Sequence, residues 1–200
     1  MNLPNKISLS RICLIPVFVA VFFLDGVLPY NYAIASAIFV IAACTDFIDG
    51  HIARSRGLVT NLGKFLDPIA DKVLVATATI LLLTLGGLFG VFESASLAKG
   101  VYIATAVSIC IILARELIIS AFRQIAATNG IVMAAEKLGK YKTACQDAAI
   151  AVLIFAADLT GNAGKFVAGL GFGLFAIATI LTVWSGVSYI WKYRKVLKDA

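Results

Sequence analysis

The sequence predicts an all-α, polytopic membrane protein with six transmembrane helices, and three observations support this fold class. Hydrophobic residues make up 61% of the 200 residues and charged residues only 14%, with a mean hydropathy of +0.97. Soluble globular domains do not have such a composition. The chain also holds six stretches that approach the roughly 20 apolar residues a span requires. Basic residues, finally, gather on one side of the membrane that these spans define.

Three spans are predicted in the first half of the chain. The first, at about residues 10–30, follows a short interfacial helix that carries Lys6 and Arg11. The second covers about residues 31–50 and begins after the breakers Gly26 and Pro29. A polar connection leads to the third, at about residues 68–90, which contains glycines near its end. A signal peptide is the alternative for the first stretch, but its removal would discard one of only six spans.

The second half of the chain holds the remaining three spans. They lie at about residues 98–122, 143–161 and 166–191, and Gly161 and Gly164 separate the last two. We find no internal repeat of the kind that transporters use. The spans leave no room for a separate soluble domain, so residues 1–200 are predicted to form a single transmembrane domain.

Basic residues predict the orientation of the chain. Alternating the connections between two sides places Lys99 and Lys165 on one side and the other fifteen of the 17 Lys and Arg residues on the opposite side. Cytoplasmic segments carry such an excess. The protein is therefore expected in the cell membrane, with both termini and the connections at 51–67 and 123–142 on the cytoplasmic side. Because the basic residues flank apolar spans, anionic lipids and phosphate substrates are the expected partners, and nucleic acid is not.

Four aspartates lie at the cytoplasmic ends of the second and third predicted spans. Asp46 and Asp49 are three residues apart and Asp67 and Asp71 are four apart, so each pair shares a helix face. Four anions close together in a membrane need compensation by positive charge. Oxygen ligands without His or Cys select hard cations, which predicts Mg²⁺ or Mn²⁺. Four carboxylates suit two ions per site, as in phosphoryl-transfer enzymes.

Two alternatives apply to these aspartates. Each one alone could cap a helix or pair with a nearby basic residue, but that explanation is weaker for four at these spacings. A cation transporter or channel would also carry intramembrane acids. It would distribute them across the membrane, whereas Asp25, Glu93 and Asp158 lie in the outer connections.

The segment from residue 46 to residue 71 resembles the signature of the CDP-alcohol phosphotransferase family, DxxDGxxAR(x8)GxxxDxxxD, at every fixed position. The resemblance implies an enzyme that transfers the phosphatidyl group of a CDP-linked lipid to an alcohol and releases CMP. It implies that Asp46, Asp49 and Asp67 hold metal, and that Asp71 holds the second ion and acts as the base. It also implies a homodimer.

The CDP-diacylglycerol site is predicted from the other signature residues and from the N-terminus. A glycine lets the backbone approach a diphosphate, and an arginine binds phosphate through its fork of donors. The N-terminal PNKISLSR segment resembles the family's PNxxTxxR motif, with Ser8 at the position of the threonine. The alternative is that this segment is an interfacial helix, with Arg11 snorkelling to the head groups. Isolated helix-end glycines are the alternative for the two signature glycines. The predicted residues are Asn5, Ser8, Gly50, Ala53, Arg54, Thr60 and Gly63.

The acceptor phosphate is predicted to bind Arg115, Arg123, Lys140 and Lys142, in the second cytoplasmic segment. Arg115 lies inside an apolar span, where an unpaired charge is costly. The set favours an acceptor that itself carries phosphate. The alternatives are an ion pair of Arg115 with Glu116 or Asp147, and anchoring of the membrane boundary by the basic residues.

Two stretches of this segment are similar to those of bacterial phosphatidylglycerophosphate synthases. They are RELIISAFR at 115–123 and KLGKYKTACQ at 137–146. The resemblance implies glycerol 3-phosphate as the acceptor and phosphatidylglycerophosphate as the product. Inositol 1-phosphate, or phosphatidylglycerol in cardiolipin synthesis, are the alternatives within the family.

Overall fold

The computed structural model describes residues 3–55, 61–92, 94–128 and 137–194, with side chains over 9–45, 69–92, 94–126 and 138–194. In these ranges the chain is all-helical, as predicted. Six long helices and one short helix follow one another: α1 (Leu3–Phe22), α2 (Asn31–Ser55), α3 (Asn61–Leu82), α4 (Gly86–Phe89), α5 (Ala95–Thr128), α6 (Lys137–Ala156) and α7 (Gly161–Lys192).

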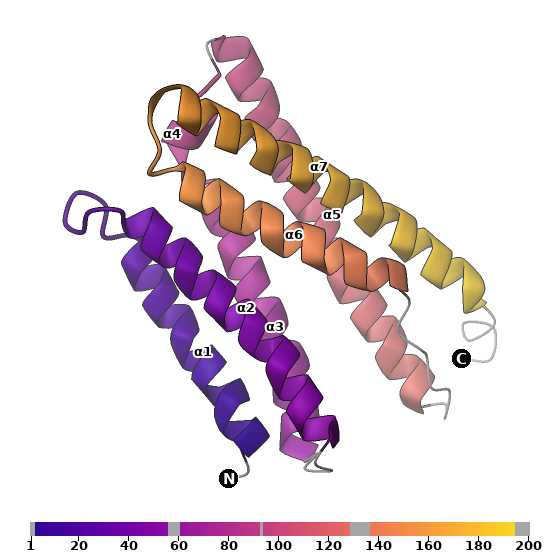
Figure 1. The fold of residues 1–200 in the computed structure, drawn as a ribbon. Helices are drawn as coiled ribbons and strands as arrows, with labels where there is room; N and C mark the ends of the chain where they lie inside the picture. Colours follow the sequence, from indigo (N-terminus) through magenta and orange to yellow (C-terminus); the bar gives the residue numbers. More distant parts are fainter. Residues whose placement is uncertain (1–2, 56–60, 93, 129–136, 195–200) are drawn as a thin grey trace.

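Successive long helices run in opposite directions (Figure 1). The end of α2 and the start of α3 lie together at the lower end of Figure 1, near the N-terminus. The end of α5, the start of α6 and the end of α7 point toward the lower right of the same view. The predicted aspartate segment, 46–71, and the predicted acceptor segment, 115–146, therefore lie toward the same end of the bundle.

Helix boundaries depart from the predicted spans in two places. Residues 3–22 form one continuous helix, α1, so the prediction of a separate interfacial helix before the first span was wrong. No glycine interrupts this segment, and Pro4 lies in the first turn, where a proline fits. The third helix begins at Asn61 and ends at Leu82, earlier than predicted at both ends. The residues before Gly86 form turns that lead into α4.

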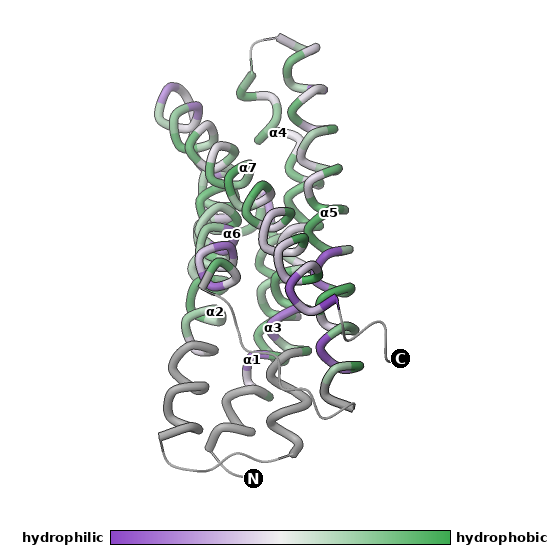
Figure 2. Tube along the Cα trace, turned by 90° about the vertical axis from the view of Figure 1, so that its right-hand side faces the viewer, coloured by the Kyte–Doolittle hydropathy of each residue, from purple (hydrophilic) through white to green (hydrophobic). Residues whose placement is uncertain are grey.

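Long apolar helices form much of the outer surface. Ala95–Ala126 in α5 and Gly161–Lys192 in α7 are long and apolar enough to cross a membrane. Leu9–Phe22 and Asn31–Thr45 are shorter apolar stretches. Hydrophobic residues predominate along α5 and α7 (Figure 2), and several large ones on α7, including Trp184 and Trp191, are exposed. Apolar side chains facing outward over whole helices indicate a membrane as the surrounding solvent.

The main hydrophobic core of the described residues contains buried side chains from every helix, α1 to α7. Phe18 of α1 is fully buried, with its ring centroid 6.0 Å from that of Phe22 and 6.2 Å from that of Phe39 in α2. Leu74 of α3 and Ile150 of α6 are also fully buried in the same cluster. Close packing of this kind fixes the rotation of each helix about its axis. The faces of α3 and α6 that point toward the site are thereby determined.

Polar contacts fasten the end of the bundle opposite the predicted site. The side-chain amide of Asn31 donates to the carbonyl of Phe22 at 2.9 Å, which satisfies a free carbonyl at the end of α1. The Asp158 carboxylate accepts a hydrogen bond of 2.6 Å from the backbone N–H of Ala33. A carboxylate at a helix N-terminus is stabilising, so Asp158 holds the start of α2.

Gly171 allows α7 to pack closely on α6, and its replacement should destabilise the fold. A Cβ at this position would lie 2.7 Å from Cδ2 and 2.8 Å from Cγ of Leu153, which is fully buried. We expect Gly171→Ala to lower the free energy of unfolding by about 1–3 kcal/mol through overpacking. Thermal unfolding in detergent measures the change.

Gly169→Ala is the matched control, because it lies on the same helix with open space around its Cβ position. Alanine favours a helix over glycine by about 1 kcal/mol. The control should therefore keep or raise the melting temperature. Equal melting temperatures for the two variants would contradict the role of Gly171.

Candidate active site

A cavity of about 240 Å³ lies between α3, α5 and α6. Each helix contributes four residues to the cavity wall: two consecutive residues, and the two that lie four positions further along. Residues at this spacing lie on one face of a helix. Apolar side chains form part of the wall, and charged or amide side chains form the rest. The lining residues are Asp71, Lys72, Val75 and Ala76 of α3, Ile112, Leu113, Glu116 and Leu117 of α5, and Lys142, Thr143, Gln146 and Asp147 of α6.

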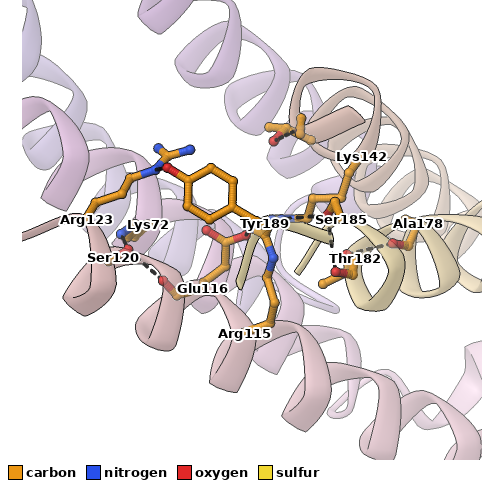
Figure 3. A network of polar contacts seen from close by, with 12 residues as sticks. Lys72, Arg115, Glu116, Ser120, Arg123, Lys142, Ala178, Thr182, Ser185 and Tyr189 are labelled. Atoms are coloured by element: carbon orange, nitrogen blue, oxygen red, sulfur yellow. Dashed lines mark hydrogen bonds and ion pairs between the residues drawn. The ribbon is translucent and has the colours of Figure 1, made fainter. Parts of the chain in front are cut away.

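Glu116 lies at the centre of a polar network beside this cavity (Figure 3). Its Oε1 atom accepts a hydrogen bond from the ammonium group of Lys142 and a second, of 3.2 Å, from Arg115 Nη1. Lys142 is only 3% exposed. A buried ammonium is very costly without a counter-ion. The carboxylate of Glu116 therefore supplies the charge that Lys142 and Arg115 both need.

Two further contacts connect the network to α3 and α7. Lys72 donates to the hydroxyl of Ser120, which in turn donates to the backbone carbonyl of Glu116 at 2.6 Å. Arg115 Nη2 donates to Ser185 Oγ of α7 at 3.0 Å. Gly186 leaves room for this arginine, since a Cβ there would lie 3.0 Å from Arg115 Cγ. Side chains from four helices thus meet around one carboxylate.

The four basic residues predicted for the acceptor occupy different environments. Lys142 lines the cavity, whereas Arg115 does not line it but forms an ion pair with Glu116, which does. Arg123 Nε donates to the Tyr189 hydroxyl at 3.1 Å, and its guanidinium carbon lies 5.2 Å from the centre of that ring. Lys140 is exposed. The structure therefore brings Arg115 and Lys142 together, and places Arg123 against α7.

The predicted metal ligands lie on two consecutive helices. Asp46 and Asp49 belong to the second half of α2, and Asp67 and Asp71 to the first half of α3. Only the Asp71 side chain is within the described range, and it lines the cavity. The described side chains contain no group of three His, Cys, Asp or Glu residues. The all-oxygen donors and the place of Asp71 fit a hard divalent cation.

All seven predicted CDP-lipid residues lie outside the described side chains. Six of them fall within helices whose side chains are not described at those positions, and Thr60 lies outside the described residues altogether. The six are Asn5, Ser8, Gly50, Ala53, Arg54 and Gly63. Their assignment to the CDP-lipid site stays a prediction.

Arg11 is buried against α2, so the alternative in which it snorkels to the head groups was wrong. It is 1% exposed, and its Nε donates to the carbonyl of Ala42 at 3.2 Å. The Thr45 hydroxyl donates to the same carbonyl at 2.7 Å. Ala42 lies one turn before Asp46. Packing of α1 on α2 covers the guanidinium and places its charge beside the turn that carries the first aspartate.

Sequence reasoning missed the importance of Lys72, Glu116 and Gln146. Glu116 entered only as an alternative ion-pair partner of Arg115, and that ion pair is present. Gln146 is 2% exposed, and its side-chain oxygen has no hydrogen-bond partner among the described residues. The spacing of four residues between Lys142 and Gln146 was a signal that both share a helix face. The spacing did not indicate which helix Lys142 and Gln146 would face.

Comparison with known proteins gives a match over most of the chain. A family model described as CDP-alcohol phosphatidyltransferase matches residues 1–184. The chain is 36% identical to a Bacillus subtilis protein named CDP-diacylglycerol–glycerol-3-phosphate 3-phosphatidyltransferase, and the alignment covers 100% of this chain and 98% of the relative.

Two plant relatives are longer than this chain. A chloroplastic/mitochondrial CDP-diacylglycerol–glycerol-3-phosphate 3-phosphatidyltransferase 1 of Arabidopsis thaliana is 38% identical over 98% of this chain and 64% of the relative. A cardiolipin synthase (CMP-forming) of Oryza sativa is 34% identical over 98% of this chain and 59% of the relative. The chain thus spans less than two thirds of these two proteins.

Proposed function

This chain belongs to the CDP-alcohol phosphatidyltransferase family, and we propose that it transfers the phosphatidyl group of CDP-diacylglycerol to glycerol 3-phosphate. The products are phosphatidylglycerophosphate and CMP. The observation that carries the choice of acceptor is the match over 98% of the length of a bacterial relative named for this reaction. The cavity that joins Asp71 to the buried Lys142 supports it independently, because a carboxylate base and a cation suit a phosphorylated alcohol.

Divalent metal is part of this proposal. Mg²⁺ or Mn²⁺, as two ions, would be held by Asp46, Asp49, Asp67 and Asp71, and when bound would polarise the diphosphate and neutralise the charge on departing CMP. The signature residues Gly50, Ala53, Arg54 and Gly63, together with Thr60, Asn5 and Ser8, would hold the CDP-lipid. The buried Arg11 would add positive charge beside Asp46.

In the proposed reaction, Asp71 accepts the proton of the attacking hydroxyl group. The hydroxyl oxygen forms a bond to the phosphorus esterified to diacylglycerol, and the bond from that phosphorus to the bridging oxygen breaks. CMP leaves with the electron pair of that bond. Lys142 and Arg115 hold the acceptor phosphate, with Arg123 and Lys140 in support, and the apolar wall of Val75, Ile112 and Leu113 limits entry of water. Positioning and electrostatics supply most of the rate enhancement in such transfers.

The membrane arrangement is proposed from the same residues. The six long helices would cross the cell membrane with both termini and the active site on the cytoplasmic side, where the basic residues lie. Membrane lipids would surround the exposed apolar faces of α5 and α7. A homodimer, implied by the family resemblance, completes the proposal.

An acceptor panel tests the proposed function. Purified protein in detergent is incubated with radiolabelled CDP-diacylglycerol, Mg²⁺ or Mn²⁺, and glycerol 3-phosphate, inositol 1-phosphate, serine or phosphatidylglycerol in parallel. We expect phosphatidylglycerophosphate from glycerol 3-phosphate, no comparable product from the others, and loss of activity on chelation. Product from inositol 1-phosphate without product from glycerol 3-phosphate would overturn the acceptor. Phosphatidylglycerol is the second candidate because the rice relative is named as a cardiolipin synthase.

A further inference from the structure

Glu116 has two carboxylate oxygens with different surroundings. Oε1 is held by Lys142 and by Arg115. Oε2 has no partner among the residues that the structure describes, and the side chain, 27% exposed, lines the same cavity as Asp71. One oxygen thus fixes the carboxylate in place, while the other is available to a bound molecule.

The chemistry of this free oxygen restricts what it can bind. A carboxylate whose charge is balanced by two cations accepts hydrogen bonds and donates none. Its partner must therefore be a donor. A phosphate group would be repelled by the carboxylate and drawn to the ammonium and guanidinium groups instead. A hydroxyl group is the donor that a phosphorylated alcohol offers.

We propose that Glu116 accepts a hydrogen bond from the acceptor hydroxyl that does not attack, and thereby selects polyol phosphates. This inference rests on the proposed function and assigns a specificity residue to it. Glycerol 3-phosphate carries the attacking hydroxyl at one end, the phosphate at the other and a free hydroxyl between them. Asp71, Glu116 and Lys142 all line the cavity, and Arg115 pairs with Glu116 beside it, so the cavity has a group suited to each of these three parts of the acceptor.

The size of the cavity agrees with a small polyol. At about 240 Å³ it is smaller than the roughly 300–1,000 Å³ of pockets that hold drug-sized molecules. In a cavity of this size, a polar group left without its partner discriminates against an analogue that lacks one hydroxyl. If Glu116 served only as a counter-ion for Lys142 and Arg115, removal of that hydroxyl from the substrate would have little effect.

The test compares glycerol 3-phosphate with 3-hydroxypropyl phosphate, which lacks only the middle hydroxyl. For the wild-type protein we expect kcat/KM to be about 10- to 100-fold higher with glycerol 3-phosphate, the usual effect of a hydrogen bond to a charged group. In Glu116→Gln, the amide oxygen can keep its contacts with Lys142 and Arg115, and the amide NH₂ group then faces the cavity. We expect the ratio to fall at least about fivefold, because a neutral hydrogen bond replaces a charge-assisted one.

Dihydroxyacetone phosphate tests the opposite preference. It has a carbonyl, which only accepts hydrogen bonds, in place of the middle hydroxyl of glycerol 3-phosphate. Relative to 3-hydroxypropyl phosphate, it should be a poor substrate for the wild type and an improved one for Glu116→Gln. Glu116→Asp is the second variant: it keeps the negative charge but withdraws the oxygen, so the ratio should fall here too. Each ratio is measured within one preparation, so the fraction of active protein cancels.

Thr143→Val is the matched control from the same cavity wall. The Thr143 hydroxyl is already donated to the Gly139 carbonyl at 3.1 Å, so the wild-type ratio should persist in this variant. A wild-type ratio near one would overturn the role of Glu116, as would an unchanged ratio in both Glu116 variants. Transfer to another acceptor of the panel, and none to glycerol 3-phosphate, would instead overturn the proposed function on which the inference rests.

Discussion

Asp71→Asn is expected to reduce phosphatidyl transfer by about 10²–10⁴-fold, the usual contribution of a general base, and to leave CDP-diacylglycerol binding largely intact. Asparagine keeps the size of the side chain and one carbonyl oxygen, but its amide cannot take a proton from the attacking hydroxyl. Asp71 lines the cavity, and it is the predicted metal ligand whose side chain the structure describes. Single-turnover kinetics and equilibrium binding of labelled CDP-diacylglycerol separate the two effects.

Asp158→Asn is the matched control for the Asp71 variant. Asp158 lies at the opposite end of the bundle, where its carboxylate accepts a hydrogen bond from the backbone N–H of Ala33. An asparagine oxygen can accept the same bond, so activity near that of the wild type is expected. Turnover by Asp71→Asn at the wild-type rate would remove Asp71 as the base.

The sequence was sufficient to predict the helices and the family. Runs of apolar residues specify helices in a membrane because backbone groups must be satisfied within each segment. The aspartate signature was recognisable because its residues are close in the sequence. Helix ends were less accurate: α1 begins at Leu3 and α3 begins at Asn61, because a helix can include polar residues outside the apolar run that would span the membrane.

The centre of the site could not be predicted, because it depends on which helices become neighbours. Glu116 pairs with Lys142 of the next helix, and Lys72 reaches Ser120 from an earlier one. These pairs are far apart in the sequence, and many charge pairings would satisfy the same composition. Gly186 also contributes, because its missing side chain leaves space for Arg115. The burial of Arg11 could not be predicted for the same reason: the helix that buries it was not known.

Lys142→Met is expected to raise the KM for glycerol 3-phosphate by about 30-fold or more, with a much smaller change in the KM for CDP-diacylglycerol. Lys142 is buried and paired with Glu116, and truncating one partner of a buried charge pair costs about 2–5 kcal/mol. Methionine keeps the length and apolar contacts of the stem but removes the cation that would meet the acceptor phosphate. Steady-state kinetics with each substrate varied in turn measures both KM values.

Lys140→Met is the comparison, since Lys140 lies on the same helix but is exposed. Water and salt screen such a charge, so we expect its KM for glycerol 3-phosphate to rise less than about fivefold. Equal effects of the two variants would contradict a specific role for Lys142.

The double variant Lys142→Met with Glu116→Gln separates binding from stability. Loss of Lys142 alone leaves Glu116 in its ion pair with Arg115. Neutralising Glu116 as well leaves Arg115 without that counter-ion, so the melting temperature should be lower in the double variant than in Lys142→Met. The weak binding of glycerol 3-phosphate should persist, because neither residue of the double variant can bring back the lost cation. Recovery of glycerol 3-phosphate binding in the double variant would mean that Lys142 acts on the acceptor only by balancing the charge of Glu116.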